Sequence, residues 1–118
     1  MAPNPDLEYH ALAFQRRNEA AAFVAALSRV LASPAYPASS GAAPEVWLGT
    51  VGAESVTLYL NQAALVAART TFDPVPVGGS VRGSLLAPTC HRLIGGGVGA
   101  AWGVNEAERA MFGGDGAA

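Results

Sequence analysis

Apolar residues recur at intervals of three and four over the first third of the chain, which is the spacing of a buried helical face. The residues in this stripe are Tyr9, Leu12, Ala13, Ala20, Phe23, Leu27, Val30 and Leu31. Asn4 can cap such a helix, Pro5 suits its first position, and Pro34 would end it. The pattern therefore predicts one long helix over residues 4–32.

The same segment carries a second, narrower apolar stripe on the opposite side of the predicted helix. It consists of Leu7, Phe14, Ala21 and Ala25, while Arg16 interrupts the first stripe. A helix with two apolar faces is either sandwiched within its own domain or uses one face for a partner. We take these four residues and Arg16 as a candidate protein interface.

The middle of the chain changes from helical spacing to alternation. Residues 33–44 hold three prolines and a glycine, so they predict a connector rather than a helix or central strand. Residues 45–51 and 55–61 read as two strands of a hairpin, because Val56, Leu58 and Leu60 alternate with polar positions. Residues 63–72 could be helical, but their Thr-Thr-Phe ending favours a third strand.

The last third predicts shorter elements. Residues 81–87 form a strand or a short helix, and Gly95–Gly99 form a flexible loop. Asn105 and Glu108 suit the start of a helix over 105–112, after which residues 113–118 form a mobile tail. The whole chain, 1–118, is then one α+β domain. A long N-terminal helix packs on an antiparallel sheet of about four strands within residues 45–104, and a short C-terminal helix follows.

The predicted order of a long helix, three strands, a Pro-containing crossing and the pair Leu85-Leu86 resembles class I type III secretion chaperones. That resemblance implies a small dimeric α/β protein that holds an unfolded segment of an effector. Pro88 does not fit this resemblance, because this proline lies where the second helix of those chaperones continues. A helix followed by a Pro-rich connector and strands is also similar to small head–tail joining proteins of tailed phages.

Composition narrows the classes of function. The 118 residues include no lysine, and the net charge is −2, so the basic patch typical of nucleic-acid binders is not expected. Hydrophobic residues make up 51% of the chain, which argues against disorder over its whole length. The bias towards Ala, Gly, Pro and Arg matches a GC-rich genome. The start of the chain does not resemble a signal peptide, and its longest apolar run is too short to cross a bilayer. We therefore expect no membrane partner, and a location in the cytoplasm or on a particle assembled there.

Reactive side chains gather at one place only, Cys90-His91-Arg92. Neighbouring residues diverge in both helices and strands, so Cys90 and His91 do not easily form a nucleophile–base pair, and His10 is the other candidate base for Cys90. A buried thiol and a surface imidazole are expected instead. We predict no catalytic residue, no metal and no cofactor. The sequence instead favours a non-enzymatic assembly or adaptor subunit that contacts protein partners and forms a homo-oligomer. The alternative is a ligand-binding domain or small enzyme that uses Cys90, His91, Arg92, Gly97 and Trp102, and a pocket around His91 would favour it.

Overall fold

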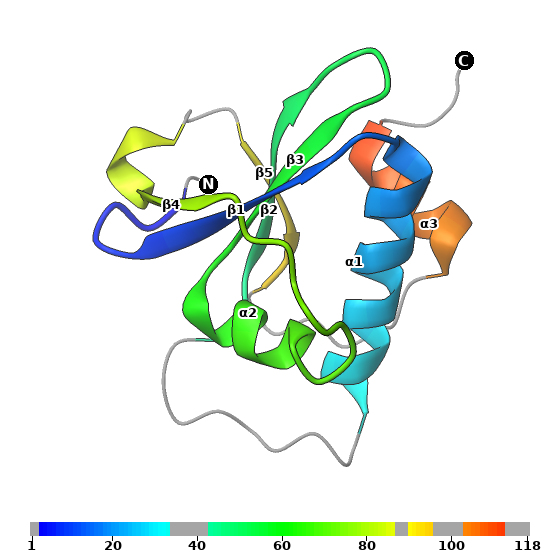
Figure 1. The fold of residues 1–118 in the computed structure, drawn as a ribbon, viewed down its shortest axis with the longest axis horizontal. Helices are drawn as coiled ribbons and strands as arrows, with labels where there is room; N and C mark the ends of the chain where they lie inside the picture. Colours follow the sequence, from blue (N-terminus) through cyan, green and yellow to red (C-terminus); the bar gives the residue numbers. More distant parts are fainter. Residues whose placement is uncertain (1–2, 34–42, 87–89, 96–102, 113–118) are drawn as a thin grey trace.

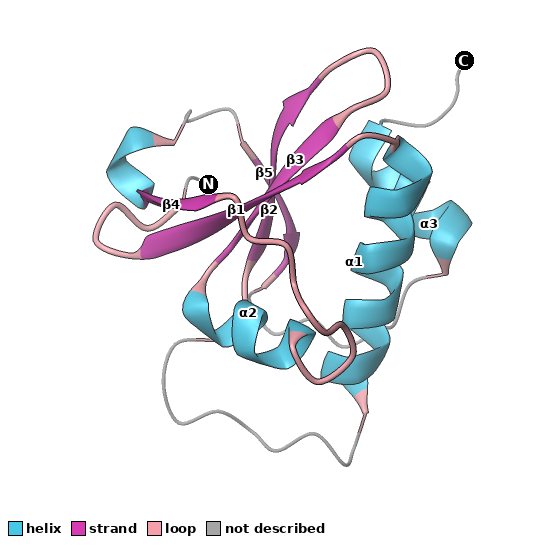
Figure 2. Ribbon diagram, viewed as in Figure 1, coloured by secondary structure: helices cyan, strands magenta, loops and turns pink. Residues whose placement is uncertain are grey.

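The computed structural model of the chain describes residues 3–33, 43–86, 90–95 and 103–112, in which helices lie beside a sheet of strands (Figure 1). The element order is β1 (Glu8–Phe14), α1 (Arg17–Ala32), β2 (Val46–Val51), β3 (Val56–Leu60), α2 (Gln62–Ala68), β4 (Gly79–Arg82), a 3-10 turn (Gly83–Leu85), β5 (His91–Ile94) and α3 (Val104–Phe112). Secondary structure along the chain is coloured in Figure 2. The predicted α+β class is confirmed.

The five strands form one antiparallel sheet in the order β4-β1-β3-β2-β5. β3 lies between β1 and β2, and β1 lies between β3 and β4, so α1 and α2 each connect two parallel strands across a third strand. Two such split β-α-β units in succession make the ferredoxin-like βαββαβ arrangement. β5 extends it beside β2, and α3 packs on α1.

Strand register separates a core face of the sheet from an opposite face. Leu58 of β3 pairs with Leu12 of β1 and with Leu48 of β2, and all three are buried under the helices. Val56, Leu58 and Leu60 follow the predicted alternation, since each is buried while the residues between them are half-buried. The helices complete this core with residues such as Phe23, Val24 and Leu27.

The prediction of one helix over residues 4–32 is wrong in its first part. Asn4 caps a tight turn, in which its Oδ1 accepts from the backbone N–H of Asp6, and residues 8–14 form β1. Tyr9 and Leu12 are both fully buried, but they lie on opposite faces of the sheet. A strand buried on both faces has apolar residues at odd and even positions, which over seven residues imitates helical spacing.

The predicted third strand over residues 63–72 is also wrong. Residues 62–68 form α2, whose start is capped by Asn61 through a bond from the backbone N–H of Ala64 to Asn61 Oδ1. The place beside β3 is taken by β1, and with β4 and β5 the sheet has five strands. The sequence allows either a strand or a helix over residues 81–87; in the structure β4 ends at Arg82, the 3-10 turn follows, and residue 87 lies outside the described residues.

The C-terminal helix is confirmed as α3, with a different cap. The Glu106 carboxylate accepts from the backbone N–H of Gly103, 3.0 Å away, so Glu106 rather than Glu108 completes the cap. Most of the predicted connector, the Gly-rich loop after Gly95 and the C-terminal tail lie outside the described residues. Within the described ranges, no helix combines the length and the hydropathy that a membrane crossing requires.

Candidate functional site

The sheet has a second face, here called the open face. It is formed by Tyr9, Ala11, Ala13, Trp47, Gly49, Thr57, Tyr59 and Val81, which register places opposite the core face. In Figure 1, α1 and α3 lie to the right of the strands and α2 below them, while the 3-10 turn after β4 lies to the left. Among the described residues, no α-helix covers the open face.

One end of the open face is covered by irregular chain. Tyr9 and Trp47 are buried there in a cluster with Cys90, against which Leu7 and Leu86 pack. The backbone N–H of Gly83 donates to the carbonyl of Leu7 at 2.7 Å, which ties the 3-10 turn to the N-terminal segment. A Cβ at position 83 would overlap with the Asn4 backbone and touch the Tyr9 ring, so glycine permits this close approach.

A carboxylate satisfies the polar atoms of this covered end. Glu45 Oε1 accepts from the Tyr9 hydroxyl at 2.8 Å and from Trp47 Nε1 at 2.9 Å. The Tyr9 oxygen in turn accepts from the backbone N–H of Asn4. Burial, followed by the bond to Glu45, raises the pKa of Tyr9 to about 12. The pKa of tyrosine in the unfolded chain is 10.0. The stabilisation of the fold by neutral Tyr9 is therefore complete below pH 10.0, and it is lost as the pH rises through about 12.

The other end of the open face is accessible. Ala13 is exposed, while Ala11, Thr57 and Tyr59 are half-buried. A Cβ at position 49 would overlap with the Tyr59 ring, so that ring lies across the space above Gly49 instead of projecting from the sheet. The accessible end is therefore built from small side chains, and the Tyr59 ring, which lies over Gly49, packs against the Tyr9–Trp47–Cys90 cluster of the covered end.

Leu85 adds an exposed apolar side chain beside the covered end of this face, where the 3-10 turn lies. It is 78% exposed, more than any other large hydrophobic residue in the described part of the chain. Its neighbours in the 3-10 turn place it on the open side of the sheet, because Gly83 touches Tyr9 and Leu86 packs in the Tyr9–Trp47 cluster. Sequence periodicity could not find this surface, since it depends on which strands are neighbours.

The interface predicted from helical stripes does not form one surface. Ala21 and Ala25 are fully buried in the core, and Phe14 is half-buried on β1, where its ring lies 5.4 Å from that of Phe23. Leu7 packs at the covered end of the open face. Arg16 is exposed just before α1. The stripe fails because residues 7 and 14 do not belong to a helix.

The residues of the alternative ligand site are only partly brought together. Cys90 is 8% exposed and His91 is exposed, as expected from the sequence. The Arg92 guanidinium lies 6.0 Å from the centre of the Trp47 ring, at the rim of the open face. Gly97 and Trp102 lie outside the described residues.

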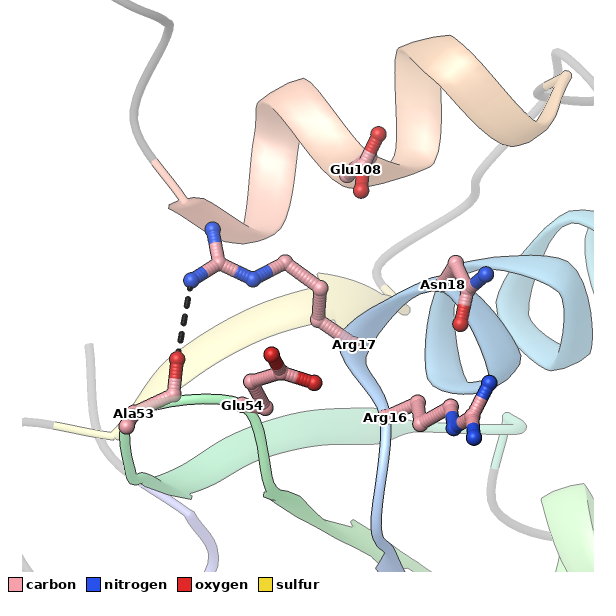
Figure 3. Close-up of a pocket in the computed structure, with 6 residues that line it drawn as sticks. All are labelled: Arg16, Arg17, Asn18, Ala53, Glu54 and Glu108. Carbon is pink, nitrogen blue, oxygen red and sulfur yellow. Dashed lines mark hydrogen bonds between the residues drawn. The ribbon is translucent and has the colours of Figure 1, made fainter.

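A shallow hollow of about 420 Å³ lies elsewhere, between the start of α1, the β2–β3 turn and α3 (Figure 3). Its lining residues are Arg16, Arg17, Asn18, Ala53, Glu54 and Glu108. Arg17 Nη2 donates to the carbonyl of Ala53 at 3.0 Å. Two arginines and two glutamates balance in charge, so the lining favours neither an anion nor a cation. His91 is not among these residues.

Comparisons with known proteins do not assign this chain to a family. They find no matching protein family, no matching curated protein and no matching solved structure. Among the described residues, no group of three or more His, Cys, Asp or Glu side chains is placed to hold a metal ion. The open face with Leu85 is thus the candidate functional site.

Proposed function

We propose that this chain is a non-enzymatic assembly or adaptor subunit that binds protein partners through the accessible end of the open face. The observation that carries the proposal is a sheet face that no described α-helix covers, with Leu85, a leucine that is 78% exposed, in the 3-10 turn at its covered end. Exposed apolar groups next to one another mark interaction surfaces more often than isolated ones do. Burying the Leu85 side chain in a complex would contribute on the order of 1.5–3 kcal/mol.

The chemistry of the open face favours protein over other partners. Its residues on β1, β2, β3 and β4 carry no ionisable group other than the two tyrosines, while Arg92 on β5 and the Glu45 carboxylate lie beside Trp47 at its covered end. Nucleic acid is bound mainly through cationic side chains on phosphates, and this surface would offer few of them. We place the protein in the cytoplasm or on a particle assembled there, as a component that acts by contact rather than by catalysis.

The test adds a charge to the proposed surface and measures the mass of the native particle in extracts of the source cells. Ala13→Glu and Leu85→Glu each introduce a carboxylate at an exposed position of the surface or its rim. The matched control is Val66→Glu on α2, where an equally apolar side chain is 49% exposed away from the open face. Burying an unpaired charge in a contact is costly, so we expect the two surface variants to run as smaller particles than wild type.

Val66→Glu should leave the particle unchanged. A wild-type chain that migrates in the extract at its own mass of 12.0 kDa would refute the proposal. Equal effects of Val66→Glu and Leu85→Glu would show that the contact lies elsewhere.

A further inference from the structure

We infer that the chain segments over the covered end of the open face form a movable cover, which opens while the main core stays folded. These segments, residues 3–7 and 83–86, are here called the strap. Opening the strap makes Tyr9 and Trp47 accessible to a partner, and this consequence alone rests on the proposed function.

None of the leucines of the strap is fully buried. Leu7 and Leu86 are half-buried against the cluster of the covered end, and Leu85 is 78% exposed. The bond from the Gly83 N–H to the Leu7 carbonyl joins the two segments of the strap to each other. The 3-10 turn follows β4, an edge strand that contains no buried residue. Segments with few buried apolar contacts are the ones that open locally while the rest of a protein stays folded.

The polar atoms under the strap keep their partners when it leaves. The Tyr9 hydroxyl and Trp47 Nε1 both donate to the Glu45 carboxylate, which is not part of the strap. The strap itself contributes the Asn4 N–H, which donates to the Tyr9 oxygen at 3.0 Å and can bond to water after opening. Opening therefore strands no buried polar group, which would otherwise be its largest cost.

The cluster under the strap has the composition of a protein-binding surface. Tyr9 is 0% and Trp47 1% exposed, and the Arg92 guanidinium lies 6.0 Å from the centre of the Trp47 ring. Tyrosine, tryptophan and arginine are the residue types enriched at the energetic centres of protein interfaces. This cluster is separate from the main core, which lies on the other face of the sheet. Opening would thus extend the accessible end of the open face without disturbing the core.

Cys90 reports on the opening, because it is the single cysteine of the chain and is 8% exposed within this cluster. The purified chain is labelled with iodoacetamide at neutral pH, in urea concentrations below those that unfold it. Opening of the strap exposes little surface, so the labelling rate should stay constant in low urea, whereas access through global unfolding would rise steeply with urea. The rate should lie about tenfold or more below that of the unfolded chain, since the closed strap protects the thiol.

Two variants loosen the strap and two controls do not. Tyr9→Phe removes the hydroxyl that holds Asn4, so labelling in low urea should become about three- to tenfold faster. Gly83→Ala places a Cβ that overlaps with the Asn4 backbone, and it should accelerate labelling at least as much. The matched control Tyr59→Phe removes a hydroxyl from the same cluster that makes no hydrogen bond to the described strap residues. Val24→Ala weakens only the main core. Neither control should change the labelling rate in low urea.

A labelling rate that rises in parallel with global unfolding from the lowest urea concentration overturns the inference, because Cys90 would then be reached only in the unfolded chain. Equal acceleration by Tyr9→Phe and Tyr59→Phe overturns it too, since the strap would not control access. Both results leave the proposed function standing, because the particle test with Ala13→Glu does not involve the strap. Conversely, an unchanged particle with the expected labelling pattern removes the proposed function and leaves the movable strap.

Discussion

Phe14 illustrates how the position of one side chain determines its role. Its ring packs 5.4 Å from Phe23, whose own ring lies 4.7 Å from Phe72, so the three form an aromatic group under the sheet. Phe23 is 4% exposed and Phe14 is half-buried. We therefore predict that Phe14→Ala lowers the free energy of unfolding by about 1.5–3 kcal/mol, and Phe23→Ala by about 3–5 kcal/mol. Urea denaturation measures both. A Phe14→Ala variant that keeps full stability but loses association would restore Phe14 to the interface.

At the scale of elements, Asn61 joins α2 to the sheet. It is 2% exposed, and its Oδ1 accepts from the backbone N–H groups of Ala64 (3.0 Å) and Glu45 (2.9 Å). Its Nδ2 donates to the carbonyl of Ala43 at 2.8 Å. Asn61→Ala removes the cap and leaves buried groups without partners, so it should lower the free energy of unfolding by about 2–4 kcal/mol.

The control for Asn61 is Asn105→Ala in the first turn of α3. Asn105 is exposed, so thermal or urea unfolding of that variant should differ from wild type by no more than about 0.5 kcal/mol. If Asn61→Ala is equally mild, the polar links of Asn61 contribute little to stability.

At the scale of the whole molecule, the homo-oligomer expected from the sequence would couple the fold to concentration. A dimer that forms from folded chains stabilises the folded state by mass action, so its melting temperature rises with protein concentration. We predict such a rise for the wild-type chain, and calorimetry over a hundredfold range of concentration measures it. A wild-type melting temperature that does not change with concentration would contradict self-association.

The elements that could be predicted from the sequence are those whose pattern is local. The β2–β3 hairpin follows from alternation at Val56, Leu58 and Leu60 and a turn between the strands. The start of α3 lies one residue before the predicted start, and its end coincides with the predicted end. The burial of Cys90 and exposure of His91 also follow from the ordinary behaviour of those side chains.

The remaining elements and the open face were decided by tertiary structure. The spacing of apolar residues along one element does not predict which other elements pack against its two faces. Residues 8–14 are a strand since neighbours on both sides supply hydrogen bonds and both faces are covered in part, Tyr9 on one and Leu12 on the other. Residues 62–68 form a helix that Asn61 caps, and β3 is paired with β1 on one side and β2 on the other. The open face depends on strand order, which brings residues 11, 49 and 59 together from three strands. By itself the sequence determined an α+β chain with a buried core and little charge. Which face that core left uncovered was decided only when the strands paired, because pairing sets which side of each strand the helices cover.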